Sequence, residues 1–160
     1  MANMQEITGK TAVMLMLADP VSHIRGSALI NRAFADLGVD AVIVPLHVAP
    51  VDLREALETA RRIKNLAGIG IPIPHKIEAM HLVDELTPQA SRAGAVNFIR
   101  RNADGSLTGT NTDGAGLVAG LKANGISPVG RSAFVAGAGG VSRAICFALA
   151  EAGVTRLRIA

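Results

Sequence analysis

The sequence predicts an α/β fold, with a mainly parallel sheet covered by helices on both faces and followed by the beginning of a second α/β domain. Three observations support this prediction. Apolar runs alternate with segments of helical periodicity over residues 11–86, an order that favours parallel strands joined by crossover helices. Asp104-Gly105 separates two short strand-like segments, which is typical of a hairpin. Glycines at 137–140 join an apolar run to a helical pattern.

The first four elements follow from apolar patterning. Thr11–Ala18 is a continuous apolar run, as expected of a strand buried on both faces. Helical spacing then extends from Ser27, a candidate N-cap, to Gly38. Asp40–Val48 is rich in valine and isoleucine and predicts the second strand. Val51–Lys64 places its apolar residues on one helical face.

The middle of the chain predicts a third strand, a helix and a hairpin. Gly68–Pro74 reads as a short strand whose prolines favour its end or a sheet edge. A helix is expected near Ile77–Leu86. Ala95–Arg101 and Ser106–Thr110 flank the Asp-Gly turn, so we expect them to pair antiparallel.

The C-terminal part predicts a connector helix from Asp113 to about Asn124 and a strand at Ser132–Ala136. A helix to about Ala152 and a strand start at Arg156–Ala160 follow. We therefore predict two domains, 1–112 for substrate binding and 113–160 for the connector and an incomplete nucleotide-binding unit. One βαβ unit cannot bury both faces of its sheet, so we expect a fragment that is inactive alone.

Composition excludes several function classes. Of 160 residues, 49% are hydrophobic and 18% charged, which excludes a disordered tail. A net charge of +3 with four Phe and no Trp or Tyr argues against nucleic-acid binding. The single cysteine, Cys146, forms no internal disulfide, zinc-type spacing is absent, and we expect no metal and a cytoplasmic location. No apolar run is long enough to span a membrane, and residues 1–10 show no targeting signal.

The glycine cluster predicts a dinucleotide site of the Rossmann type. Gly137 permits a tight turn, Gly139 a close backbone approach to pyrophosphate, and Ser142 stands where a third glycine is usual. An ordinary glycine-rich turn is the alternative. The residue that selects NAD or NADP falls about 20 positions later, beyond Ala160. The candidate cofactor-binding residues are Gly137, Ala138, Gly139, Gly140, Val141 and Ser142.

Three polar residues are candidates for chemistry on a hydroxyl group. Lys76 follows a strand end, where parallel sheets place ligands. A pair of Lys76 and Asp113 could exchange a proton with a hydroxyl, and Asn97 could donate to and accept from one. The alternatives are a solvated lysine at a helix start and an N-cap role for Asp113.

These residues occur in an order and spacing that resemble the shikimate dehydrogenase family. The matching segments are Asp19-Pro20, His23, Asn31, Ala33-Phe34, Leu37-Gly38, Pro74-His75-Lys76, Asp84-Glu85-Leu86, Gly94-Ala95-Val96-Asn97, Asp104-Gly105, Gly109, Asn111-Thr112-Asp113-Gly114 and Gly137-Ala138-Gly139-Gly140. The resemblance implies reversible, NADP-dependent reduction of 3-dehydroshikimate to shikimate in aromatic amino acid biosynthesis, with NAD an open alternative. It implies that Lys76 and Asp113 are catalytic and that Asn97 binds a substrate hydroxyl. A small-molecule substrate is the expected partner, and a homodimer stays open.

The sequence departs from the family at the expected carboxylate site. His-Ser-x-Ser-Pro is replaced by His23-Ile24-Arg25-Gly26-Ser27, and Asn-Val-Thr before the catalytic lysine by Gly70-Ile71-Pro72. Arg25 could replace the serines by a bidentate grip on a carboxylate, although an exposed arginine is the alternative. The exact substrate therefore stays open, and a noncatalytic ligand-binding or regulatory protein is the alternative function.

Overall fold

The computed structural model describes residues 6–160, so the first half of the stretch expected to lack a targeting signal, residues 1–5, lies outside the described residues. The strands are β1 (Ala12–Ala18), β2 (Ala41–His47), β3 (Leu66–Gly70), β4 (Glu85–Leu86), β5 (Phe98–Arg101), β6 (Leu107–Thr110), β7 (Ser132–Val135) and β8 (Arg156–Ile159). The α-helices are α1 (Gly26–Leu37), α2 (Leu53–Arg62), α3 (Pro88–Ala93), α4 (Asp113–Ala123) and α5 (Gly140–Glu151). Short 3-10 helices cover Pro50–Asp52 and Glu78–His81.

Six strands form the main sheet in the order β2-β1-β3-β5-β6-β4. The pairs β1–β2, β1–β3 and β4–β6 are parallel, whereas β5 runs antiparallel to both β3 and β6. The predicted α/β fold and the hairpin around Asp104-Gly105 are confirmed. Because β1 and β3 are parallel neighbours with Met16 opposite Gly70, the loops that follow them leave the same sheet edge.

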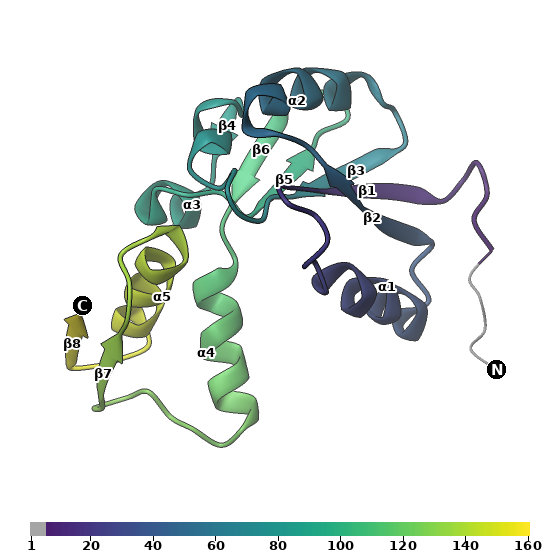
Figure 1. Ribbon diagram of the computed structural model, residues 1–160. Coiled ribbons are helices and arrows are strands. Elements are labelled where there is room, and N and C mark those ends of the chain that lie inside the picture. The colour runs from purple at the N-terminus through teal and green to yellow at the C-terminus, as the bar shows by residue number, and fades with distance from the viewer. Residues whose placement is uncertain (1–5) are drawn as a thin grey trace.

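The core lies between the sheet and α2. Leu53, Leu57 and Ala60 bury the apolar face of α2 against sheet residues that include Ile69 and Ile99. Figure 1 shows α1 on the opposite side of the sheet from α2, so helices cover both faces. The helices on both faces thus hold β1 and β3 in place, and the loops that carry the candidate site follow these strands.

Helix α1 is tied to the outer strand β2 by one side chain. Asn31 Nδ2 donates to the Ile43 carbonyl at 3.0 Å, and the Ile43 amide donates to Asn31 Oδ1 at 2.8 Å. The side-chain amide thus pairs with β2 as a neighbouring strand would.

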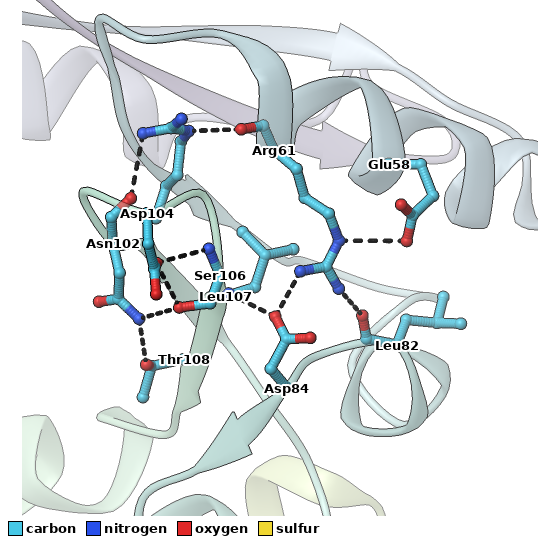
Figure 2. A network of polar contacts seen from close by, with 10 residues as sticks. Glu58, Arg61, Leu82, Asp84, Asn102, Asp104, Ser106, Leu107 and Thr108 are labelled. Carbon is cyan, nitrogen blue, oxygen red and sulfur yellow. Dashed lines mark hydrogen bonds and ion pairs between the residues drawn. The ribbon is translucent and has the colours of Figure 1, made fainter.

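A polar network joins α2 to the β5–β6 hairpin (Figure 2). Arg61 binds Asp84 through Nη1 and donates from Nη2 to the Leu82 carbonyl at 3.1 Å. Asp84 Oδ2 also accepts from the Leu107 amide at 2.7 Å. The carbonyl of Arg61 accepts from Arg101 Nε at 3.0 Å. The network therefore crosslinks three segments that are distant in sequence.

The C-terminal part contains a smaller parallel sheet, β7–β8, whose two strands are joined by α5. Helices α4 and α5 lie side by side, and α3 lies beside α5 (Figure 1). No helix in residues 6–160 combines the length and apolar character needed to cross a bilayer.

Several local predictions were wrong. The third strand ends at Gly70, since Pro72 and Pro74 follow it in a loop. The expected helix at 77–86 is instead a 3-10 turn followed by β4, because β4 pairs with the distant β6. Helix α3 was missed, although Thr87 caps it by accepting from the Ala90 amide.

The N-cap prediction for Ser27 was also wrong. Helix α1 begins one residue earlier, at Gly26, and its N-cap is Arg25, whose side chain makes no capping bond. Ser27 lies inside the first turn and is buried. The side chain therefore faces protein rather than closing the helix end.

Candidate active site

The loop after β3 is fastened to the segment before β5 by two backbone hydrogen bonds. The Ile71 amide donates to the Asn97 carbonyl at 2.8 Å, and the Val96 amide donates to the Lys76 carbonyl at 2.8 Å. These bonds fix the backbone of Lys76 next to that of Asn97. Lys76 and Asn97 come together because β3 and β5 are direct neighbours in the sheet.

Lys76 and Asp113 form a part-buried ion pair. Lys76 Nζ donates to Asp113 Oδ2 at 2.7 Å, and the two side chains are 16% and 21% exposed. Asp113 is the first residue of α4, whereas Lys76 comes from the loop after β3. The pair therefore bridges the first part of the chain and the connector helix at their junction.

Asn97 orients Asp113 from the other side. Asn97 Nδ2 donates to Asp113 Oδ1 at 2.8 Å and to Thr112 Oγ1 at 3.0 Å, and Asn97 Oδ1 accepts from the Thr112 amide at 3.0 Å. Both oxygens of Asp113 are thus engaged, one by Lys76 and one by Asn97. A substrate hydroxyl that binds Asn97 must share or replace one of these bonds.

Asn111 is a supporting residue to which sequence reasoning gave no separate role. It is buried, its Oδ1 accepts from the Asp113 amide at 3.0 Å, and its Nδ2 donates to the Ala95 carbonyl at 3.1 Å. The N-cap alternative for Asp113 is wrong, because Thr112 holds the N-cap position. Because these contacts fix the position of the first turn of α4, the carboxylate of Asp113 faces Lys76.

The pair has the chemistry of a proton-exchange site. An ammonium carries three donors, and among the described residues only Asp113 accepts from Lys76. The remaining donors are available to an oxygen atom of a ligand. Unlike a guanidinium, an ammonium can release its proton to such an oxygen.

His75 lies next to Lys76 and has a structural role. It is 2% exposed, and its Nε2 lies 2.8 Å from the carbonyl of Val48, the first residue after β2. The contact joins two loops at the same sheet edge. In residues 6–160 no three His, Cys, Asp or Glu side chains gather so that they could hold a metal ion.

The glycine turn between β7 and α5 fits a phosphate-bearing cofactor. Gly137 has φ +99°, a left-handed conformation that favours glycine. A Cβ built on Gly139, the N-cap of α5, meets nothing within 4 Å, so a ligand can approach the backbone there. Across residues 6–160 no acceptor engages the amides of the first helical residues, Gly140, Val141 and Ser142. Free amides at a helix N-terminus bind phosphate well.

The start of α1 contains two further polar side chains. Arg25 is exposed and forms no ion pair with the described residues. Ser27 is 8% exposed, and its hydroxyl has no hydrogen-bond partner in residues 6–160. A Cβ built on Gly26 would lie 3.9 Å from the Met16 methyl group, and one built on Gly70, at the end of β3, would lie 3.2 Å from the same methyl group. The start of α1 therefore lies on the same sheet edge as the loop that carries Lys76.

Ser27 is the residue that sequence patterning misassigned, and no sequence signal distinguishes a buried first-turn serine from a cap. The Ser27 hydroxyl has no protein partner in residues 6–160 and is not sealed from solvent, so it is available to an oxygen atom of a ligand. In the same residues no acceptor engages the amides of Gly26 and Ser27, which adds further donors at this helix end.

Comparison with known proteins identifies relatives along nearly the whole chain. The family model for the shikimate dehydrogenase substrate binding domain matches residues 16–99. Shikimate dehydrogenase (NADP(+)) of Rubrobacter xylanophilus is 41% identical over 154 residues, which are 96% of this chain and 54% of that protein. The chain thus spans about half the length of the curated relatives it matches.

Solved structures agree with this match. Shikimate 5-dehydrogenase from Listeria monocytogenes, in complex with shikimate and NAD, superimposes with a TM-score of 0.86 at 36% identity, covering 96% of this chain and 52% of that one. The ligand-free 5-ketofructose reductase of Gluconobacter sp. strain CHM43 has a TM-score of 0.85 at 30% identity, covering 95% of this chain and 54% of that one. One scaffold therefore serves proteins named for different substrates.

Proposed function

The chain belongs to the shikimate dehydrogenase family, and we propose that it supplies the substrate site and phosphate-binding turn of an NADP-dependent oxidoreductase. The reaction is the reversible reduction of 3-dehydroshikimate or a related keto-cyclohexene or keto-cyclohexane carboxylate. Residues 1–112 form the substrate domain, and residues 113–160 form the connector and the first part of the nucleotide-binding domain. The 2.7 Å contact between Lys76 and Asp113 carries this proposal.

The proposed chemistry assigns one role to each side chain. NADPH, when bound at the glycine turn, would supply the hydride for the new C–H bond at the carbonyl carbon. Lys76 donates a proton to the carbonyl oxygen, which becomes the hydroxyl, and takes that proton back in the reverse direction. Asp113 holds the ammonium toward the oxygen, and Asn97 holds Asp113 while sharing its amide with a substrate hydroxyl.

The carboxylate of the substrate is proposed to bind at the start of α1. Arg25 offers a guanidinium that is free of ion pairs in the described chain, and Ser27 offers an unpartnered hydroxyl. Charge-assisted hydrogen bonds from a guanidinium to a carboxylate are among the stronger polar contacts in proteins. The two residues would replace donors that Ile24, Gly26 and Pro72 cannot provide from their side chains.

A noncatalytic ligand-binding protein is the second candidate. The apolar side chains of Ile24 and Pro72 and the bare backbone of Gly26 favour it. In that case the chain binds a hydroxylated ligand without turnover. The 5-ketofructose reductase relative adds a neutral ketose to the ligands worth testing.

The test combines calorimetry with turnover. Shikimate, quinate and 5-ketofructose are titrated into the 160-residue chain and into the longest translated protein that contains it, as wild type and as Lys76→Ala. Turnover with NADP and NAD is measured on the same samples. Loss of at least 100-fold in kcat for Lys76→Ala supports the enzyme. Unchanged turnover overturns the assignment, and binding without turnover in the longer wild-type protein favours the second candidate.

A further inference from the structure

Two glycines lie at close contacts between α5 and the segments that carry the candidate site. A Cβ built on Gly114 would lie 2.3 Å from the Ala144 carbonyl oxygen and 2.7 Å from Ala148 Cβ. A Cβ built on Gly140 would lie 2.6 Å from Ala95 Cβ. All three separations are far inside the usual contact distance of about 3.5 to 4.0 Å. The backbones therefore approach more closely than any side chain at 114 or 140 would permit.

Both contacts adjoin site residues in the sequence. Gly114 directly follows Asp113, and Ala95 lies two residues before Asn97. The Ala95 carbonyl also accepts from Asn111, which holds the Asp113 amide. Figure 1 shows α5 lying against α4 and α3 at this junction.

The other partner of each contact is the helix that carries the glycine turn. Gly140 is the first residue of α5, and Ala144 lies one turn later. The contacts are direct, because Gly140 packs against Ala95 and Gly114 packs against Ala144 and Ala148. A shift of α5 would therefore move the turn relative to Lys76 and Asp113 directly.

We propose that Gly114 and Gly140 are positioning residues that fix the distance between the glycine turn and the Lys76–Asp113 pair. The effect of this positioning role on turnover rests on the proposed function, whereas its effect on the position of the glycine turn does not. A methyl group at position 140 must move α5 by about 1 Å to reach ordinary contact distance. Misplacement of about 1 Å can lower a rate about 100-fold.

The central test uses Gly140→Ala together with its compensating partner. Ala95→Gly removes the methyl group that the new side chain would meet, so the double variant should restore the wild-type approach. Gly116→Ala is the matched control, because it lies on α4 and a Cβ there meets nothing within 4 Å. Wild type, Gly140→Ala, Ala95→Gly, the double variant and Gly116→Ala are crystallised and assayed in parallel.

The structural readout is the position of residues 137–142 after superposition on residues 6–112. We expect a displacement of about 1 Å in Gly140→Ala, recovery in the double variant and none in Gly116→Ala. In an active protein, kcat should fall about 100-fold in Gly140→Ala with the KM for shikimate within twofold, and the double variant should recover it. A purely structural defect would instead lower the fraction of active protein, and the loss of activity in each variant would follow its loss of thermal stability.

The outcomes separate the two proposals. An unmoved turn in Gly140→Ala overturns the positioning role, whatever the activity. A moved turn in a protein whose wild type neither binds nor turns over substrate supports the positioning role and overturns the proposed function. If Gly140→Ala does not fold, folding of the double variant supports the contact. If the double variant does not fold although Ala95→Gly does, the positioning role is overturned.

Discussion

Two aspartate–cation pairs in this chain show how similar contacts serve different purposes. Lys76 meets Asp113 where the loop after β3 reaches α4, and Arg61 meets Asp84 where α2 reaches the segment before β4. In the first pair the cation has one protein partner among the described residues. In the second, Arg61 also binds Glu58 and the Leu82 carbonyl (Figure 2). Each nitrogen of Arg61 thus already binds a protein acceptor, whereas the single nitrogen of Lys76 still has N–H donors for a ligand.

The protonation behaviour of the second pair is correspondingly fixed. The hydrogen bond from Arg61, followed by that from the Leu107 amide, lowers the pKa of Asp84, and the hydrogen bond to Asp84 raises the pKa of Arg61. Near neutral pH neither group exchanges its proton. An ion pair thus points to chemistry when its cation has a proton that it can transfer, as lysine does, and to structure when the cation is an arginine that stays protonated.

Exchanging the two cations gives the largest expected effect. Lys76→Arg keeps the charge and the contact with Asp113 but removes the transferable proton, so we expect kcat to fall about 10²- to 10⁴-fold. Steady-state kinetics on the longer active protein measure it. The matched control, Arg61→Lys, should leave kcat within twofold. Equal losses in both variants would show that the two pairs are equivalent and remove the distinction.

Truncating the amides beside the pairs should affect stability next most strongly. Asn97→Ala removes the side-chain hydrogen bonds to Asp113 and Thr112 and leaves the Thr112 amide without its acceptor, so the free energy of unfolding should fall by about 2 to 3 kcal/mol. Asn102→Ala near the second pair removes bonds to Ser106 and Thr108 hydroxyls that water can replace, at a cost of about 1 kcal/mol. Urea unfolding of both variants tests the order. A larger loss for Asn102→Ala would contradict it.

The second pair should give a pH-dependent stability. Because the pKa of Asp84 is lowered from its ordinary 3.8, its ionised form stabilises the fold at pH above 3.8 and loses that contribution as pH falls through the lowered value. Asp84 is 44% exposed, so solvent screening limits the effect of Asp84→Asn to about 1 kcal/mol at pH 7. Thermal melts of both proteins should converge as the pH drops below 3.8. A difference that persists or grows there would argue against the pair as its source.

A third ion pair should contribute least to the free energy of unfolding. Arg32 and Asp36 lie one turn apart on α1, with side chains 77% and 59% exposed. Arg32→Ala should therefore lower the free energy of unfolding by at most about 0.5 kcal/mol. Chemical unfolding in low and high salt checks this value. A loss as large as that of Asp84→Asn would mean that exposure does not rank these pairs.

Sequence patterning predicted the elements whose signals are local. Apolar runs identified β1 and β2, and the Asp-Gly turn identified the β5–β6 hairpin. The segment at 77–86 was wrong because its conformation depends on a distant partner. The Asp84 amide donates to the Leu107 carbonyl, and the strand that follows pairs with β6. No helical period can report such a contact.

The candidate site likewise has features that could be predicted from the sequence and features that could not. The hairpin predicted that Asn97 lies near Asp113, and the family resemblance added Lys76 as the partner of Asp113. The structure brings the three together, although their roles stay predictions. The support from Asn111 and the unpartnered Ser27 depend on side-chain directions that spacing does not determine. The contacts at Gly114 and Gly140 depend on how closely α5 crosses its neighbours, which no single segment encodes.

The bonds between Asn31 and Ile43 close the outer edge of the main sheet. Ile43 turns its amide and carbonyl outward to Asn31, and by the two-residue period of a strand Pro45 occupies the next outward position, where it has no N–H to offer. An approaching chain therefore finds no row of open donors and acceptors along β2. This edge is protected against strand addition, the step by which exposed sheets grow into aggregates and fibres.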